Sequence, residues 1–152
     1  MAIYHLSVKI GSRANGNSAV ASASYRSAEK LHSQTDNKTF DYTRKQAVVY
    51  TEIMLPENAP KEYADRATLW NNVEASEKQA NAQLYREFEI SLPNECTRDK
   101  QIEMTRRFAD SLRQEGMCVD IAIHDVKAGQ YRTKHRKTTT DNCHAHIMCT
   151  LR

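Results

Sequence analysis

Residues 142–150, NCHAHIMCT, alternate polar and apolar side chains in the way that a half-buried β-strand does. Because successive side chains of a strand point to opposite faces, His144 and His146 are predicted to share one face of a sheet. Residues 121–124, IAIH, form a second short apolar segment that ends on His124. Three imidazoles that converge from two strands make a candidate site for a divalent metal ion, with positions left for further ligands.

The same kind of pattern predicts the other elements of the chain. Period-two alternation predicts strands at residues 2–10, 46–54, 84–92, 118–126 and 143–151. Helical spacing predicts helices at residues 18–32, from Pro60 through Val73, and from a Thr97 N-cap to a Gly116 stop. The polar residues 33–47 are interpreted as a loop. Since the strands alternate, we predict an α+β fold, a mainly antiparallel sheet of about five strands with helices covering one face.

The composition is that of a compact globular protein. The 152 residues are 39% hydrophobic and 27% charged, which suits a single domain spanning residues 1–152. The N-terminus lacks the basic-then-apolar order of a signal peptide, and no segment approaches the roughly 20 apolar residues that span a bilayer. We therefore expect a cytoplasmic protein without membrane insertion. The four cysteines form no CxxC pair and are predicted to be buried thiols rather than zinc ligands.

A basic stretch separates His124 from His144. No acidic residue occurs between Asp125 and Asp141. The stretch contains basic and aromatic candidates for DNA binding: Lys127, Tyr131, Arg132, Lys134, Arg136 and Lys137. Lys and Arg would contact phosphates and Tyr131 could stack on a base, although composition alone equally suits a solvated loop. Further candidate DNA contacts are Lys9, Arg13 and Arg26.

Three further residues are candidates for catalysis. Tyr25 lies off the aliphatic stripe of the predicted 18–32 helix, which makes a simple core role less suitable. A phenol, with a reference pKa of about 10, is a poor nucleophile unless a base or a nearby cation activates it. Glu87 or Glu89 could be that base, or could orient a histidine. A metal, a tyrosine, a carboxylate and a basic loop together favour attack of tyrosine on a phosphodiester, although each piece alone has a structural explanation.

Five segments of the chain resemble the motifs of MobA/MobL-family plasmid mobilisation relaxases, in the order in which the family has them. They are residues 4–9 (YHLSVK), 18–26 (SAVASASYR), 70–74 (WNNVE), 86–93 (REFEISLP) and 142–146 (NCHAH). The resemblance implies an HUH endonuclease, a metal-dependent bacterial enzyme that nicks one strand at a plasmid origin of transfer. By the same resemblance, Tyr25 attacks the scissile phosphate and becomes joined to the 5′ end, leaving a free 3′-OH, and the step reverses on religation.

The resemblance also assigns ligands and partners. His124, His144 and His146 match the metal-binding histidines, and Glu87 and Glu89 match an acidic strand near the tyrosine. The implied cofactor is Mn²⁺ or Mg²⁺, with Zn²⁺ or Ni²⁺ as alternatives. The implied partners are single-stranded or melted origin DNA together with accessory mobilisation and coupling proteins. Relaxases continue beyond the histidine strand, so residues 1–152 are expected to be an N-terminal relaxase domain of a longer protein.

Three alternatives stay open at this point. A rolling-circle replication initiator would use the same chemistry at a replication origin. A non-catalytic DNA-binding module could hold a structural metal on the histidines, and would react with DNA no differently when Tyr25 is replaced. An ordinary metallohydrolase would use a metal-bound water, so Tyr25 would be dispensable and no covalent adduct would form.

Overall fold

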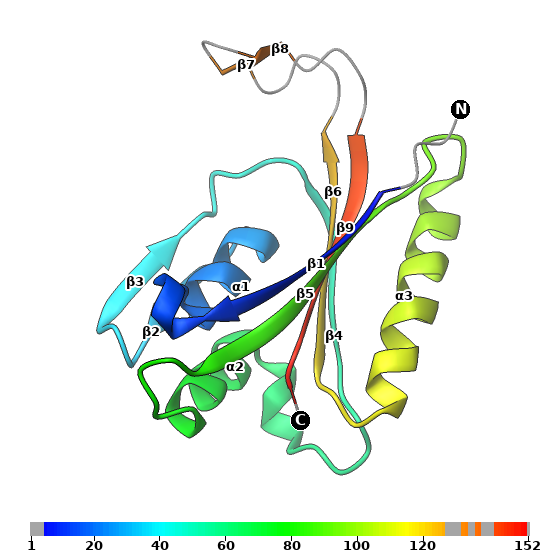
Figure 1. Ribbon diagram of the computed structural model, residues 1–152. Helices are drawn as coiled ribbons and strands as arrows, with labels where there is room; N and C mark the ends of the chain where they lie inside the picture. The colour runs from blue at the N-terminus through cyan, green and yellow to red at the C-terminus, as the bar shows by residue number, and fades with distance from the viewer. Residues whose placement is uncertain (1–4, 127–131, 134–135, 138–141, 152) are drawn as a thin grey trace.

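The computed structural model describes residues 5–126, 132–133, 136–137 and 142–151 of the chain. Five strands form one sheet in the order β1-β5-β9-β6-β4, and every neighbouring pair is antiparallel. These strands are β1 (Leu6–Ser12), β4 (Val48–Met54), β5 (Gln83–Ser91), β6 (Val119–Val126) and β9 (Asn142–Cys149). The predicted α+β fold with a five-stranded antiparallel sheet is therefore confirmed (Figure 1).

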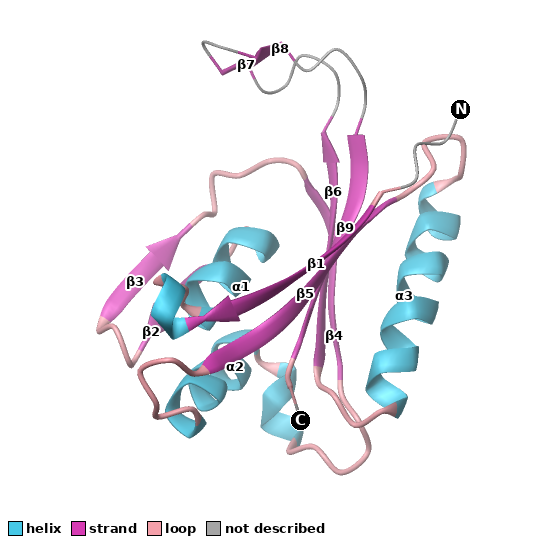
Figure 2. Cartoon of the chain, in the orientation of Figure 1, coloured by secondary structure: helices cyan, strands magenta, loops and turns pink. Residues whose placement is uncertain are grey.

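Three α-helices pack on this sheet: α1 (Ala19–Ser27), α2 (Arg66–Ser76) and α3 (Arg98–Gln114). Two short 3-10 helices, η1 (Arg13–Asn15) and η2 (Lys61–Ala64), precede α1 and α2. Helices α1 and α2 cover one face of the sheet, and α3 covers the other (Figure 2). The prediction that helices cover a single face was wrong, because the central strands bury apolar residues on both sides. Met148 packs in the cluster under α1 and α2, whereas Ala145 and Ile147 pack under α3.

The segment after α1 differs most from the prediction. The helix ends at Ser27 instead of continuing to residue 32, because Ala28 adopts a left-handed conformation (φ 57°) and its N–H donates to the carbonyl of Ser24. The chain then forms a hairpin, β2 (Lys30–Ser33) with β3 (Lys38–Asp41), inside the region interpreted as helix and loop. Leu31 fits a helical stripe by its spacing from Ser27, but it is buried as an alternate residue of β2.

The caps of the other two helices follow the sequence more closely. Thr97 accepts a hydrogen bond from the Lys100 N–H at the start of α3, and Gly116, with φ +94°, follows its end, as predicted. The α2 helix begins at Arg66, later than the predicted Pro60. Its N-cap is Asp65, which accepts a hydrogen bond from the Thr68 N–H at 3.0 Å. Two short segments, β7 (Arg132–Thr133) and β8 (Arg136–Lys137), pair with each other between β6 and β9 in the sequence.

Buried polar contacts fix α1 and α2 against the sheet. Asp120 on β6 accepts hydrogen bonds from Arg66 and from Nε1 of Trp70, both on α2. Glu74 of α2 accepts from the Ala19 N–H at the start of α1 at 2.6 Å. These contacts satisfy buried donors and hold α1 over the face of the sheet that carries the histidines.

Candidate active site

Three histidines meet on the sheet face that α1 and α2 cover. His124 of β6 and His144 of β9 are directly paired across the two strands, and His146 follows two residues later on β9. Their ring centroids are 4.5 to 5.3 Å apart. One nitrogen from each ring lies within 4.8 Å of the others, which is close enough for the three to share a metal ion.

The hydrogen bonds of two histidines fix which nitrogen can ligate. Nε2 of His124 lies 2.7 Å from the carbonyl oxygen of Arg26, and a carbonyl can only accept, so Nε2 carries the proton and Nδ1 keeps its lone pair. Nδ1 of His146 lies 2.8 Å from Oε1 of Glu87 and donates to it, which leaves Nε2 of His146 to ligate. Carbonyl and carboxylate partners of this kind orient metal-binding histidines.

The protonation states of the cluster suit a metal ion. Burial lowers the pKa of His124 to about 3, so its imidazole is neutral at physiological pH, as a ligand must be. Burial raises the pKa of Glu87, but hydrogen bonds from His146 and Arg26 outweigh this effect and lower the pKa to about 2. Glu87 is therefore a carboxylate that accepts from His146. Imidazole nitrogens fit Mn²⁺, Zn²⁺ or Ni²⁺ on donor type, whereas Mg²⁺ prefers oxygen ligands.

Arg26 connects α1 to this cluster through both its backbone and its side chain. Its carbonyl accepts from His124, and its Nη2 donates to Oε2 of Glu87 at 2.5 Å. Nη1 donates to the Ser22 carbonyl within the same helix at 3.2 Å. The last turn of α1 is thus attached to two strands of the sheet. The guanidinium of Arg26, a predicted DNA contact, pairs with a buried carboxylate, and no local sequence signal indicates that pairing.

Tyr25 lies one residue before Arg26, on α1. It is 46% exposed, in agreement with its place off the aliphatic stripe. Its ring meets the ring of Tyr42 edge to face, with the centroids 5.2 Å apart and the planes at 88°. Nζ of Lys45 lies 3.5 Å from the centroid of the Tyr25 ring and donates to the Tyr25 carbonyl at 3.2 Å. Both neighbours come from residues that the sequence pattern left as loop.

The two glutamates occupy the same face of β5 but have different surroundings. Glu87 is 2% exposed and uses both oxygens, one for Arg26 and one for His146. Glu89 lies opposite His146 in the β5–β9 register and is only partly buried. The ligand atoms of Glu87, Glu89 and His146 also lie within 4.8 Å of one another, so an acidic group adjoins the histidines.

The predicted DNA contacts do not all lie on the histidine face of the sheet. Lys9 on β1 lies opposite Glu87 in the register, and its exposed side chain shares the histidine face. Arg13 bonds to Glu74 and to the carbonyls of Glu77 and Gln79, which joins η1 to the end of α2. Lys127, Tyr131 and Lys134 lie outside the described residues, and only the backbone of Arg132, Arg136 and Lys137 is described.

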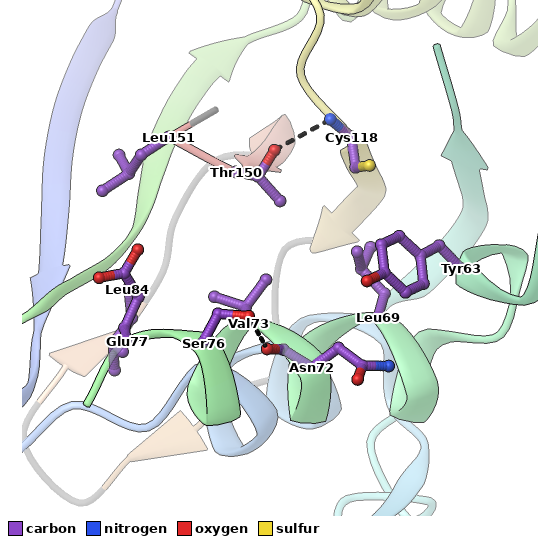
Figure 3. A pocket seen from close by; sticks show the side chains of 10 residues that line it. All are labelled: Tyr63, Leu69, Asn72, Val73, Ser76, Glu77, Leu84, Cys118, Thr150 and Leu151. Atoms are coloured by element: carbon purple, nitrogen blue, oxygen red, sulfur yellow. Dashed lines mark hydrogen bonds between the residues drawn. The ribbon is translucent and has the colours of Figure 1, made fainter. Parts of the chain in front are cut away.

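A cavity of about 150 Å³ lies elsewhere, between α2 and the end of the chain that the structure describes (Figure 3). Leu69 and Val73 of α2 line it together with Thr150 and Leu151, which follow β9. None of the predicted site residues lines this cavity.

The three buried cysteines are Cys118, Cys143 and Cys149, as expected for structural thiols, whereas Cys96 is partly exposed.

Comparisons with known proteins place the chain in a family. The sequence profile of the MobA/MobL family matches residues 17–152. The chain is 38% identical over 163 residues to the conjugal transfer protein TraA of Rhizobium radiobacter, covering 100% of this chain and 14% of the relative. It is also 38% identical over 162 residues to the mobilization protein MobL of Acidithiobacillus ferridurans, covering 97% of this chain and 42% of the relative. The chain thus spans less than half the length of either relative.

A solved structure from work on the molecular basis of vancomycin resistance transfer in Staphylococcus aureus has a similar fold. The TM-score is 0.85 and the sequence identity 41%, with 99% of this chain and 71% of the other chain covered. Among the described residues, no helix has both the length and the apolar character needed to cross a membrane. The profile match and the curated relatives together show that this chain belongs to the MobA/MobL family.

Proposed function

We propose that residues 1–152 form the relaxase domain of a longer mobilisation protein, which nicks one strand of plasmid origin-of-transfer DNA through attack by Tyr25. One observation carries the proposal: Arg26 attaches the last turn of α1 to both His124 and Glu87, and the half-exposed Tyr25 directly precedes it. This contact supports the proposal because it ties the helix turn that carries Tyr25 to the histidine cluster, and attack on a phosphate requires the nucleophile and the metal ion to be held in fixed positions. Family membership supports the same function.

The cofactor that fits is a divalent metal ion held by His124, His144 and His146. When bound, it would supply positive charge beside the non-bridging oxygens of the scissile phosphate. The imidazole donors favour Mn²⁺, Zn²⁺ or Ni²⁺ by affinity, although cellular availability can place Mg²⁺ or Mn²⁺ in such a site. His124 and His146 are already oriented for this role by the Arg26 carbonyl and by Glu87.

The transfer step exchanges one phosphate ester for another. The phenol oxygen of Tyr25 forms a bond to phosphorus, and the bond from phosphorus to the 3′ oxygen breaks. The 5′ end is then joined to Tyr25, and the 3′ oxygen leaves as a hydroxyl after taking up a proton. Because the phosphotyrosyl ester keeps the energy of the original bond, the free 3′-OH can attack it later and reseal the strand.

The two glutamates differ in their suitability as the base that takes the Tyr25 proton. Glu87 has a pKa of about 2 and uses both oxygens in hydrogen bonds, so it is a weak base and acts by orienting His146 and Arg26. We therefore assign Glu89, on the same face of β5, as the base that takes the Tyr25 proton.

The proposed substrate is single-stranded or locally melted DNA, because a duplex hides the extended backbone that such a site must reach. Lys9 and the basic residues between 127 and 137 would contact its phosphates. Accessory mobilisation and coupling proteins are the proposed protein partners. Since the substrate is plasmid DNA, we place the reaction in the bacterial cytoplasm.

A rolling-circle replication initiator is the second candidate, since it would use the same step. The similarity to conjugal transfer and mobilization proteins favours plasmid transfer over replication. Only a substrate comparison separates the two activities. Oligonucleotides carrying a plasmid transfer origin should react, whereas those carrying the replication origin of the same plasmid should not.

The experiment incubates the protein with Mn²⁺ and a labelled single-stranded origin oligonucleotide, followed by denaturing electrophoresis. A labelled protein band should form with the wild type and with Tyr63→Phe, a control tyrosine on η2. The band should be lost with Tyr25→Phe and with EDTA. Cleavage without a band would indicate metal-activated water and would contradict the proposal. An equal band from Tyr25→Phe would also contradict it.

A further inference from the structure

The segment from Tyr42 to Lys45, between β3 and β4, is a tight turn that is tied to α1 and to β6. The Lys45 N–H donates to the Tyr42 carbonyl at 3.0 Å, which closes the turn. The Tyr42 N–H donates to the carbonyl of Glu29, just after α1. Two residues beyond the turn, the Ala47 carbonyl accepts from the Asp125 N–H at 2.9 Å, next to His124. The turn is therefore fixed to the two elements that carry Tyr25 and His124.

The first and last residues of this turn, Tyr42 and Lys45, both contact the ring of Tyr25. Tyr42 presents its ring at 88° to that of Tyr25, which is the edge-to-face arrangement that aromatic quadrupoles favour. Lys45 places Nζ 3.5 Å from the ring centroid, within the range of a cation–π interaction. The ring is thus contacted by a cation and by an aromatic ring, while the residue remains 46% exposed.

The Lys45 ammonium also completes the end of α1. It donates to the Tyr25 carbonyl at 3.2 Å, and the last carbonyls of a helix lack partners within the helix. A cation at this end also complements the negative end of the helix dipole. Lys45 therefore fixes the backbone and the ring of the same tyrosine. A half-exposed tyrosine without such contacts would lose more rotamer freedom on reaching the phosphate.

We propose that Lys45, supported by Tyr42, is a positioning residue for Tyr25: its ammonium holds the ring in the orientation for attack and stabilises the negative charge that develops on the phenol oxygen. This inference rests on the proposed function. Partial burial supports it, because a cation taken out of water interacts more strongly with an aromatic face.

The test separates DNA binding from the covalent step in the full chain. Single-turnover adduct formation is measured at saturating single-stranded DNA with Mn²⁺, and the Kd for the same DNA is measured in parallel with EDTA. Lys45→Met removes the charge at similar length, Lys45→Arg keeps it, and Lys38→Met is the matched control. Lys38 also lies over an aromatic ring, that of Phe40, with Nζ 5.3 Å from the centroid, but on the neighbouring hairpin.

We expect Lys45→Met to slow adduct formation about tenfold while changing Kd less than about twofold. Lys45→Arg should restore most of the rate, because a guanidinium also stacks on a ring. Lys38→Met should change neither quantity. Tyr42→Leu should slow the reaction, whereas Tyr42→Phe, which keeps the ring edge, should not; this pair keeps the test informative if Lys45→Met folds poorly.

Two results would overturn the inference. If Lys45→Met weakens Kd but leaves the saturating rate unchanged, Lys45 is a DNA contact and does not position Tyr25. If Lys45→Met matches the wild type in both, the contact has no role in the reaction. Either result leaves the proposed function standing, provided that Tyr25→Phe abolishes the adduct. Adduct formation by Tyr25→Phe would instead remove the proposed function itself.

Discussion

Arg26 donates from Nη2 to Oε2 of Glu87 at 2.5 Å, across the gap between the last turn of α1 and the sheet. The other oxygen of this buried carboxylate accepts from His146, and the Arg26 carbonyl accepts from His124. Arg26 and Glu87 together therefore contact two candidate metal ligands, His124 and His146, and tie the helix turn that carries Tyr25 to the sheet. Because a buried charge that loses its partner is costly, these positions are coupled.

Glu87→Gln should weaken metal binding. The variant keeps the size of the side chain but replaces the carboxylate that holds His146 and Arg26. Loss of such an outer partner of a ligating histidine lowers metal affinity about 10- to 100-fold. Titration calorimetry with Mn²⁺ measures the change. Glu89→Gln, on the same strand face, is the matched variant, and an equal loss of affinity in both would contradict the distinction between the two glutamates.

Lys45 should titrate well below the ordinary pKa of a lysine side chain. Burial, with a smaller repulsion from Arg26, lowers its pKa from 10.5 to about 8. The titratable and charged groups around it are Tyr25 and Arg26 of α1, Tyr42 of its own turn, and His124 of β6. Between pH 8 and 10.5 the unfolded chain keeps this proton and the folded protein releases it, so the contribution of Lys45 to stability rises with pH across this window.

NMR of the ¹³C-dimethylated lysines in the DNA-free protein measures this titration. One resonance should have a midpoint near pH 8, and Lys45→Arg should remove that resonance. Lys100, which forms an exposed pair with Glu103, provides the reference lysine. A spectrum in which every lysine titrates together above pH 10 would contradict the partial burial of the ammonium.

Gly11→Ala should destabilise the packing of β1 against Tyr85 of β5. A Cβ added at Gly11 would lie 2.1 Å from the ring of Tyr85, whose hydroxyl bonds to Ser22 of α1 at 2.7 Å. Forcing an atom into such a contact costs about 1–3 kcal/mol of unfolding free energy, which urea denaturation measures. In the double variant with Tyr85→Leu, the Gly11→Ala cost should be smaller, and a fully additive result would contradict the contact. Lys9→Ala on the same strand is the control.

Asp120→Asn should be strongly destabilising. Asp120 is 5% exposed and accepts from both Nε and Nη2 of Arg66, as well as from Trp70. Removing its charge leaves the buried guanidinium without its main counter-ion, at a cost of about 3 kcal/mol in urea unfolding. Glu103→Gln breaks an exposed pair with Lys100 and should cost less than about 0.5 kcal/mol. Similar losses in both variants would contradict the buried pair.

The sequence predicts the five strands because period-two alternation is a local pattern. The shared face of His144 and His146 follows from that pattern, and the register of β6 and β9 sets His144 directly opposite His124. Helices on both faces agree with residues 143–149, which carry apolar side chains on both faces of the strand. The alternation of the other strands predicts only one buried face, and therefore helices on one side of the sheet.

The contacts around Tyr25 could not be predicted in the same way. The hairpin of β2 and β3 has strands of only four residues, too short to establish a period, and Leu31 fits either pattern. Arg26 and Glu87 are 61 residues apart in the chain, and Lys45 stands in a polar segment without periodicity. Their contacts depend on how α1 packs on the sheet, which local spacing does not encode.

The most direct test of the central claim is to identify the residue to which the DNA becomes attached. The denatured adduct is digested with nuclease and protease, and tandem mass spectrometry locates the nucleotide remnant. We predict a 5′-linked phosphonucleotide on Tyr25, a free 3′-OH on the released DNA, and loss of both when the metal is chelated. A remnant on Tyr42, or cleaved DNA that ends in a free 5′ phosphate with an unmodified protein, would contradict the account.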